Sequence, residues 1–318
     1  MKRVAGIWDL ARSSGSLGTL LILLEELEIQ RQIHGADLVD VVIVGNATHL
    51  VNGMPSRQTD VPGGFCISDV AKLAPMIAVL RAMSGVSDCH VCADQTKIRD
   101  VTRRMRTNCV MWPDPEMLMQ GRHSYDSTHA IQDFYAREGN IPRLSVDAPL
   151  LVWAKSYLKE KARGRLPVAV HLKNDPNVSG ESNANIDSWW SFMSNCRHEY
   201  EVHFILVGDD RTNGKFRTLK NVTIAQDDGV TLERYLAIIQ STGLFMGTMS
   251  GPANMALFGK NPYLIFKHPD HHAREMAMEL GDSDHYPFAL AHQRVLRMWD
   301  TTERLFDGFE SVYRQVFA

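Results

Sequence analysis

The sequence lacks an excess of basic residues, a long apolar run and a regular set of cysteines. Its formal net charge is −3 with 13 histidines counted as neutral, whereas nucleic-acid-binding domains usually carry a clear positive excess. We therefore expect no nucleic acid among its partners. The basic stretch "KIRDVTRRMR" at residues 97–106 is typical of a solvated helix face, with contact to an anionic substrate or a membrane surface as the alternative.

No apolar segment reaches the length that a membrane span requires. The first residues, "MKRVAGIWDLARSSGSLGTLLILLEEL", are basic and then apolar, as in a signal peptide. However, Asp9 and Arg12 interrupt the apolar run, and glutamates 25, 26 and 28 follow it. We expect a soluble cytoplasmic protein with at most peripheral membrane contact.

The cysteines are few, odd in number and scattered, so a disulfide framework is not expected and a reducing compartment is the default. They are Cys66, Cys89, Cys92, Cys109 and Cys196. The "CHVC" motif has the spacing of half a zinc site, but no second CxxC and no matching histidine pair accompanies it. We expect buried thiols and no metal ion.

The 318 residues suit two domains of roughly 150 residues each. At the N-terminus an apolar strand, "RVAGIWDL", precedes a Gly/Ser turn, a helix pattern and a second buried strand at 37–45. The helix pattern consists of Leu17, Leu20, Leu24 and Leu27. This β-α-β order implies parallel strands. Further on, helix patterns occur near 68–84 and in "THAIQDFYAREGNIP", where Gly139 is expected to end the helix.

The second half alternates short apolar strands with helix patterns, without the polar alternation of a half-exposed sheet. The predicted strands are 167–172, 202–208, 221–225, 243–247 and 262–266, and the predicted helices are "IDSWWSFMSNC", "TLERYLAIIQS" and "PANMALFG". We predict an α/β fold with two Rossmann-like domains. The domains are an N-terminal one at 1–149, a linker helix at 150–166, a second domain at 167–296 and a C-terminal helix at 297–318.

The stretch "MGTMSGPANMALFGKNPYLIF" breaks an apolar run and then resumes as helix and strand. Ligands of open α/β sheets bind at such breaks after buried strands. Ser250 and Gly251 begin a helix whose free N–H groups favour an anion, and Thr248 adds a hydroxyl donor. Asn254 follows within the same segment. Simple helix capping by Ser250 is the alternative.

A second break follows the strand at 167–172. His171 offers a tunable donor, Lys173 a point charge for phosphate, and Asn174 stands beside them. Farther along the same polar segment, Asn183 or Asn185 offers an amide for hydroxyl groups or a base. A solvated loop is the alternative.

A third strand ends at Gly208, and Asp209 or Asp210 follows as a candidate partner for ribose hydroxyls or as an Asx turn. The segment "KHPDHHAREM" contains three histidines, but the adjacent pair does not share a helix face, which disfavours a metal site. We expect instead that Lys267 or His268 contacts phosphate.

The loop after the first strand lacks the lysine of GxxxxGK[ST] and does not fit GxGxxG, so a P-loop enzyme and a dinucleotide enzyme are not supported. Asp9 is a candidate general base and Arg12 a candidate anion clamp, with an ordinary turn residue as the alternative for Asp9. The remainder of this loop consists of Ser14, Gly15, Ser16 and Gly18.

The second half resembles the donor domain of GT-B glycosyltransferases. "VAVHLKND" looks like the HxRxxD-type loop of the fucosyltransferase-like group, with Lys173 where arginine usually stands, and residues 245–266 are similar to the strand-loop-helix that holds the donor diphosphate in heptosyltransferases. The resemblance implies two domains facing across a cleft, a C-terminal helix that returns to the first domain, and a diphosphate neutralised without metal. It implies that the N-terminal loop faces the acceptor.

The resemblance therefore predicts a metal-independent transferase of the hexosyl or deoxyhexosyl type, with no cofactor. The donor is expected to be a nucleotide-diphosphate sugar and the acceptor a hydroxyl of a glycan or lipid-linked glycan, as in polysaccharide biosynthesis. Asp9, Arg12 and His171 are the candidate catalytic residues. A nucleotide-sugar epimerase or hydrolase of the same fold, and a non-catalytic nucleotide- or glycan-binding protein, are the alternatives.

Overall fold

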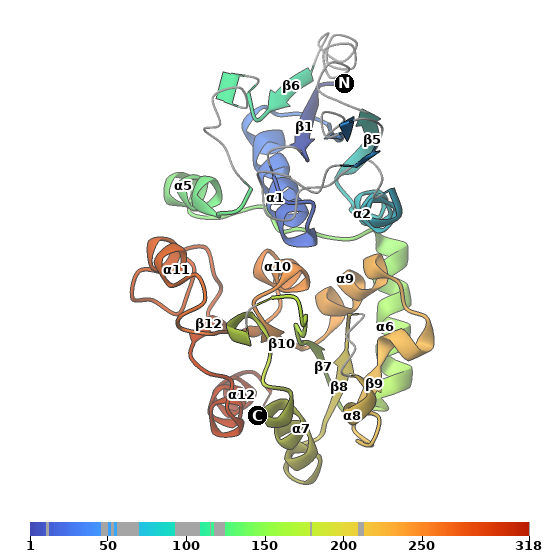
Figure 1. The fold of residues 1–318 in the computed structure, drawn as a ribbon, viewed down its shortest axis with the longest axis vertical. Coiled ribbons are helices and arrows are strands. Elements are labelled where there is room, and N and C mark those ends of the chain that lie inside the picture. The colour runs from blue at the N-terminus through green and yellow to red at the C-terminus, as the bar shows by residue number, and fades with distance from the viewer. Residues whose placement is uncertain are drawn as a thin grey trace. The chain divides into compact units, whose positions relative to one another are not determined.

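The computed structural model describes residues 1–10, 13–45, 50–51, 54–55, 70–92, 109–114, 116–117, 125–178, 180–208 and 213–317. The chain divides into two compact units, Met1–Asp147 and Ala148–Ala318 (Figure 1). Several positions singled out in the sequence lie outside the described residues. These are Arg12, Cys66, the basic stretch 97–106, Asp209 and Asp210.

The first unit is an α/β structure built on a parallel four-stranded sheet with the order β5-β2-β1-β6. Its elements are β1 (Arg3–Asp9), α1 (Leu17–Ile33), β2 (Leu38–Val44), β3 (Leu50–Val51), β4 (Met54–Pro55), α2 (Val70–Ala82), β5 (Val86–Cys92), β6 (Cys109–Trp112) and α5 (His129–Glu138). Strands β3 and β4 form a separate antiparallel pair.

The local sequence explains the best-ordered elements of this unit. Six of the seven residues are buried in both β1 and β2, which is the pattern of strands covered on both faces. The predicted leucine stripe is buried on α1. Helix α5 ends, as predicted, at Gly139, which adopts a left-handed conformation with φ 71°.

The second unit is also α/β, with a parallel six-stranded sheet in the order β12-β11-β10-β7-β8-β9. Its α-helices are α6 (Ala148–Ala162), α7 (Ile186–Glu199), α8 (Asn213–Phe216), α9 (Leu232–Ser241), α10 (Gly251–Leu257), α11 (Ala273–Leu280) and α12 (Thr302–Val316). Its strands are β7 (Leu166–His171), β8 (Val202–Leu206), β9 (Val222–Ile224), β10 (Leu244–Thr248), β11 (Tyr263–Lys267) and β12 (Gln293–Arg297). Two 3₁₀ turns, Gly180–Ser182 and Ala225–Asp228, complete it.

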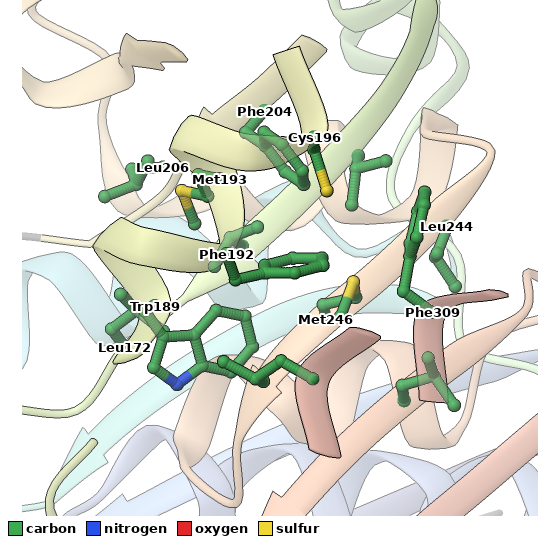
Figure 2. Packing of buried hydrophobic residues seen from close by; sticks show 14 of the residues in the cluster. Leu172, Trp189, Phe192, Met193, Cys196, Phe204, Leu206, Leu244, Met246 and Phe309 are labelled. Carbon is green, nitrogen blue, oxygen red and sulfur yellow. The ribbon is translucent and has the colours of Figure 1, made fainter. Parts of the chain in front are cut away.

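Helices α7 and α12 cover one face of this sheet, and α6, α9 and α10 cover the other (Figure 1). Under α7 and α12, the Phe192 ring packs edge-to-face against Trp189, Phe204 and Phe309, with centroids 5.6 to 6.2 Å apart (Figure 2). Alternate residues of β10, Leu244 and Met246, complete the same cluster. This core fixes the strands whose ends carry the candidate site.

The helix predicted as a linker and the C-terminal helix both pack within the second unit. Helix α6 contacts α9, β7 and β8 within the second unit, and its role as a linker between the domains remains a prediction. Helix α12 buries Leu305, Phe309 and Val312 in the core beside α7. A return of this helix to the first unit remains a prediction.

All five predicted strands of the second half are present, as are its three predicted helices. The sequence analysis missed β12 and α11. Strand β12 reads "QRVLR", with Arg294 and Arg297 between buried residues, so it resembles neither a continuous apolar run nor a turn. Its position at the edge of the sheet, where one side has no strand neighbour among the described residues, accommodates those charges.

Candidate functional site

The second sheet reverses its strand order at β7. The chain runs outward from β7 to β8 and β9, and then crosses to β10 on the opposite side of β7. Ligands of open α/β sheets bind outside the carboxyl ends of the strands at such a switch point. The carboxyl ends of β7 and β10 are His171 and Thr248. Two breaks that the sequence analysis singled out separately are therefore neighbours.

The two strands approach each other closely at their carboxyl ends. A Cβ added to Gly247, whose φ is +159°, would lie 2.2 Å from the His171 carbonyl oxygen. No side chain fits at that distance, so glycine is required at this position. The close approach brings the loops that follow β7 and β10 together.

His171 and Ser250 are joined across the switch point. The Ser250 hydroxyl and His171 Nδ1 share a hydrogen bond of 2.8 Å. Ser250 stands at the N-cap of α10 in an extended conformation, but its side chain makes no capping hydrogen bond. The plain capping alternative for Ser250 is therefore wrong. Instead, the hydroxyl orients the imidazole that ends the neighbouring strand.

Thr248 and Lys173 make the second link across the switch point. The backbone N–H of Lys173 donates to the buried Thr248 hydroxyl over 3.0 Å. Within the described part of the chain, the half-buried Lys173 ammonium forms no ion pair. Lys173 thus carries its positive charge on a loop that is tied to the end of β10. Gly251 and the buried Asn254 lie on α10 directly after Ser250.

The segment after β7 is held by side-chain hydrogen bonds, although residues 176–178, 180 and 181 are exposed. The Asn183 amide accepts from the Asp175 N–H and donates to the Asp175 carbonyl, each over 2.9 Å. The Asn185 side chain caps α7 by accepting from the Ser188 N–H. Each asparagine therefore has a structural partner, and Asn183 also lines the small pocket at the ends of β10 and β11; a ligand role for either stays a prediction. Asn174 lies half-buried at the start of this segment.

Gly208 ends the segment after β8 beside the same imidazole. Its φ is +119°, and an added Cβ would lie 2.9 Å from His171 Cδ2. The His171 ring therefore lies between Gly208 and Ser250. Gly208 contributes through this close approach, which its lack of a side chain permits.

Lys267, at the end of β11, carries a buried ammonium group. Only 6% of the residue is exposed, and Nζ donates to His271 Nδ1 over 2.7 Å. Burial, together with the nearby Lys173 charge, lowers the pKa of Lys267 to about 8. Burial and the adjacent Lys267 charge lower the pKa of His271 to about 4, so His271 is a neutral acceptor at pH 7.

Lys267, His271 and Thr248 line one small pocket at the ends of β10, β11 and β12. His268 also lines it; its side chain is 8% exposed, and Nδ1 accepts from the Asp270 N–H over 3.1 Å. The pocket adjoins the switch point through Thr248. Lys267 and His268, the predicted phosphate contacts, therefore both line this pocket, whose volume is about 20 Å³.

The sequence analysis missed Asp300, which also lines this pocket. Its Oδ2 accepts from the Asn185 N–H over 2.9 Å and from Trp189 Nε1 over 2.7 Å. Burial raises the pKa of this carboxyl. Asp300 ties the loop after β12 to the start of α7, and no sequence signal other than an acid after an unrecognised strand would have indicated it.

The first unit has its own switch point, because β1 lies between β2 and β6. Asp9 ends β1 at this point and is 6% exposed. Its carbonyl accepts from both the N–H and the hydroxyl of Ser13 over 3.0 Å, which turns the chain into the loop before α1. Asp9 therefore has the position expected of a site residue in this unit.

The rest of the predicted acceptor-side loop leads into α1. Ser16 is its N-cap, and its hydroxyl accepts from the Thr19 N–H over 3.2 Å. The Ser14 carbonyl accepts from Trp8 Nε1 over 3.3 Å. Gly15 is buried between these serines, and Gly18 lies in the first turn of α1. The loop is thus anchored to its own unit, and its role toward an acceptor stays a prediction.

A larger pocket, of about 520 Å³, lies at the end of the first sheet where the parallel strands begin, opposite to the end that carries Asp9. It is lined at the amino ends of β2 and β5, by Leu38 and Val86 among others. This end is remote from Asp9, so the pocket does not belong to the candidate site.

Among the described residues, no three His, Cys, Asp or Glu side chains gather as ligands for a metal ion. Cys92 is buried, and burial raises the pKa of the half-buried Cys89 to about 11. Both cysteines lie on β5; the expectation of a buried thiol holds for Cys92, whereas Cys89 is only half-buried. No helix in the described part of the chain is both long and apolar enough to span a membrane.

Solved structures share this fold over the whole chain. A glycosyl transferase family 9 protein from Veillonella parvula matches with a TM-score of 0.61 at 10% identity, covering 99% of this chain and 97% of that one. The ADP-heptose lipopolysaccharide heptosyltransferase II of E. coli matches with a TM-score of 0.58 at 12% identity over 100% of both chains. The E. coli heptosyltransferase WaaC with ADP gives 0.53 at 11%, covering 98% and 99%.

No protein-family model and no curated protein matches the sequence. At such low identity the structural likeness shows the fold, which is that of the GT-B glycosyltransferases. The predicted fold class is thereby confirmed. The likeness covers both halves of the chain, whereas the sequence resemblance was specific only in the second half.

Proposed function

We propose that this protein is a glycosyltransferase that moves a sugar from a nucleotide-diphosphate donor to a hydroxyl group of a glycan or lipid-linked acceptor. The observation that carries the proposal is the pair of links across the second unit's switch point. His171 with Ser250, and the Lys173 backbone with Thr248, bring together the loops that carry an imidazole, two hydroxyls and the Lys173 ammonium. Hydroxyl, imidazole and ammonium donors are the groups that bind diphosphate oxygens.

In this proposal, the Lys173 ammonium neutralises charge that develops on the diphosphate as the bond to the sugar breaks. The Thr248 hydroxyl donates to the phosphate oxygens, together with either the Ser250 hydroxyl or His171 Nε2, because the hydrogen bond between Ser250 and His171 Nδ1 uses one of their protons. Lysine in place of arginine supplies a point charge rather than a bidentate fork. Gly208, Gly251 and Asn254 surround the same bound group. Asp209, beyond Gly208, is proposed for the donor from its sequence position alone.

Removal of the acceptor proton is assigned to Asp9 in the first unit. A buried carboxylate at the end of β1 is suited to accept a proton from a hydroxyl group in the transition state. The likeness in fold to heptosyltransferases supports the division of labour between the two units, and Arg12 is proposed as an anion clamp in the same loop. Proton transfer of this kind contributes roughly 10²- to 10⁴-fold to a rate.

The test begins with thermal unfolding in the presence of GDP, UDP, CMP, dTDP and ADP at matched concentrations. A ligand at a hundredfold its dissociation constant stabilises a protein by about 2.7 kcal/mol. The nucleotide that stabilises best identifies the donor class, and transfer from the corresponding labelled sugar donor is then measured. Water-dependent turnover without an acceptor would favour a hydrolase, and tight binding without product a non-catalytic protein.

Lys173→Ala is the decisive variant, and Lys260→Ala is its control because Lys260 is exposed in the same unit. We expect Lys173→Ala to weaken nucleotide binding about 10- to 100-fold and to abolish transfer, with Lys260→Ala unchanged. Normal binding and turnover in a folded Lys173→Ala variant would contradict the proposal.

A further inference from the structure

The Lys267 ammonium lacks an anionic partner among the described residues. Only 6% of the Lys267 residue is exposed, and its Nζ donates to the neutral His271 imidazole. A buried charge is costly unless a charge of opposite sign or a set of hydrogen bonds compensates it. Lysines that merely support a fold reach water with their ammonium group, so Lys267 requires another explanation.

The surroundings of Lys267 favour an anion. The pocket that it lines also contains the Thr248 hydroxyl and the imidazoles of His268 and His271. His268 Nδ1 accepts the Asp270 N–H, which leaves the proton of the neutral ring on Nε2, and this buried nitrogen has no hydrogen-bond partner among the described residues. The Nε2 donor of His268 and the ammonium of Lys267 thus belong to residues that line the same pocket.

The carboxylate of Asp300 on the pocket does not serve as counter-ion. It is engaged by the Asn185 N–H and by Trp189 Nε1, and Lys267 forms no ion pair with it or with any other described residue within 4.0 Å. Lys173 is close enough that its charge contributes to the lowered pKa of Lys267. Without a ligand, the charges of Lys173 and Lys267 repel each other. An anion that lies near both makes the electrostatic energy of the group favourable.

We propose that the pocket at the ends of β10, β11 and β12 is an oxyanion site, in which Lys267 is the counter-ion of a phosphate group. His271 positions the ammonium by accepting one of its protons, and Thr248 and His268 are the neighbouring donors. This site adds a phosphate-binding residue to the proposed function. It rests on that function only for the source of the phosphate. That source is either the diphosphate of the nucleotide-linked donor or a separate phosphate group.

The site is tested by calorimetric binding of inorganic phosphate, inorganic diphosphate and the stabilising nucleoside diphosphate to the full chain in phosphate-free buffer. Lys267→Met removes the charge at nearly constant volume, and is expected to fold because it removes an uncompensated buried charge. Lys267→Arg keeps the charge, and Lys260→Met is the control at an exposed position. We expect Lys267→Met to lose about 10- to 100-fold in diphosphate affinity, with Lys260→Met unchanged.

Equal diphosphate affinity in Lys267→Met and the unmodified protein overturns the oxyanion site, as does the absence of binding by all three probes. If the binding of the nucleoside diphosphate depends on both Lys173 and Lys267, the donor diphosphate is the source of the phosphate. If inorganic phosphate binds through Lys267 and does not compete with the nucleoside diphosphate, the source is a separate phosphate group.

Failure of the site and failure of the proposed function give different results. If nucleoside diphosphates depend on Lys173 but not on Lys267, the function stands and the site is wrong. If no nucleotide binds while inorganic diphosphate still depends on Lys267, the site stands and the function is wrong.

A pH series adds a readout that loss of packing would not reproduce. Because the free Lys267 has a pKa of about 8, binding an oxyanion at pH 9 requires proton uptake, and the affinity relative to Lys267→Arg should fall about 10-fold from pH 7 to pH 9. An unchanged ratio would count against the site. The titratable groups that line the pocket or act on Lys267 and His271 are Lys173, Glu181, His268, His271, His272, Glu275 and Asp300.

Discussion

The Ser250 hydroxyl is hydrogen-bonded to His171 Nδ1 over 2.8 Å, although 79 residues separate the two in the chain. Ser250 occupies the N-cap of α10, where a serine ordinarily accepts from the helix backbone, yet it makes no such bond. The residue thus serves the neighbouring strand end instead of its own helix. This separates the two readings of its role, because capping affects stability and orientation of His171 affects binding and turnover.

Ser250→Ala is expected to cost about 0.5 to 1.5 kcal/mol of stability, because the hydrogen bond to His171 is lost but no helix cap is. Transfer should fall at least about 10-fold, because the imidazole loses its orienting partner and the diphosphate loses a donor. Thr301→Ala is the matched control, since the Thr301 hydroxyl caps α12 by accepting from the Arg304 N–H. The control should lose about 1 kcal/mol with unchanged transfer. Denaturant unfolding and steady-state kinetics together check both; the reverse pattern would contradict the assignment.

Gly247→Ala should disrupt the switch point, because the added Cβ would lie 2.2 Å from the His171 carbonyl oxygen. Neither strand can move without breaking ladder hydrogen bonds, so we expect a loss of at least about 2 kcal/mol together with loss of nucleotide binding. Gly229→Ala is the control: its φ is +69°, and nothing lies within 4 Å of the added atom. It should cost about 1 kcal/mol through backbone strain alone. Equal unfolding midpoints for the two variants would show that the close approach is not limiting.

Asp9→Asn is expected to leave nucleotide binding unchanged and to lower transfer by at least about 100-fold, the lower range for loss of a general base. The amide keeps the size of the side chain but cannot accept the acceptor proton. Asp133→Asn on the exposed side of α5 is the control in the same unit and should behave as the unmodified protein. Binding is measured by calorimetry and transfer with a labelled donor. Full transfer by Asp9→Asn would remove Asp9 from the mechanism.

Stability should fall as the pH is lowered from about 6.5 toward 4, in part because of His203. This residue is buried on β8 and hydrogen-bonded to the Thr223 hydroxyl over 2.8 Å. Burial and nearby arginines lower its pKa from 6.5 to about 4. Between these values the unfolded chain binds a proton that the folded chain does not, so acid favours unfolding.

His203→Gln should therefore flatten the pH dependence, with a difference from the unmodified protein of at most on the order of 3 kcal/mol across this range. His198→Gln on the exposed end of α7 is the control and should leave the dependence unchanged. The free energy of unfolding in urea at pH 7, 6, 5 and 4 checks this. Parallel curves for His203→Gln and the unmodified protein would assign the acid sensitivity to other groups.

The local sequence pattern was sufficient to predict most strands and helices of the second unit. Continuous apolar runs such as those of β7 and β10 can be buried only inside a sheet covered on both faces, and the polar residues that follow mark the strand ends. Hence His171, Lys173, Thr248 and Ser250 could be chosen as site residues from the sequence alone. Strand β12 was missed because its charged alternation is compatible with an edge strand only once its neighbour is known.

Only the tertiary structure decided which strand ends are neighbours. An apolar pattern determines that a strand is buried, but the order of strands depends on how helices pack on both faces. That packing places β10 beside β7, joins Ser250 to His171 and ties Asp300 to the start of α7. It also buries Lys267 among neutral partners. The sequence by itself determined the buried apolar strands, the breaks that follow them and the residue types at those breaks. The packing of the folded chain determined which of them meet, because contacts between distant segments arise only when the core forms.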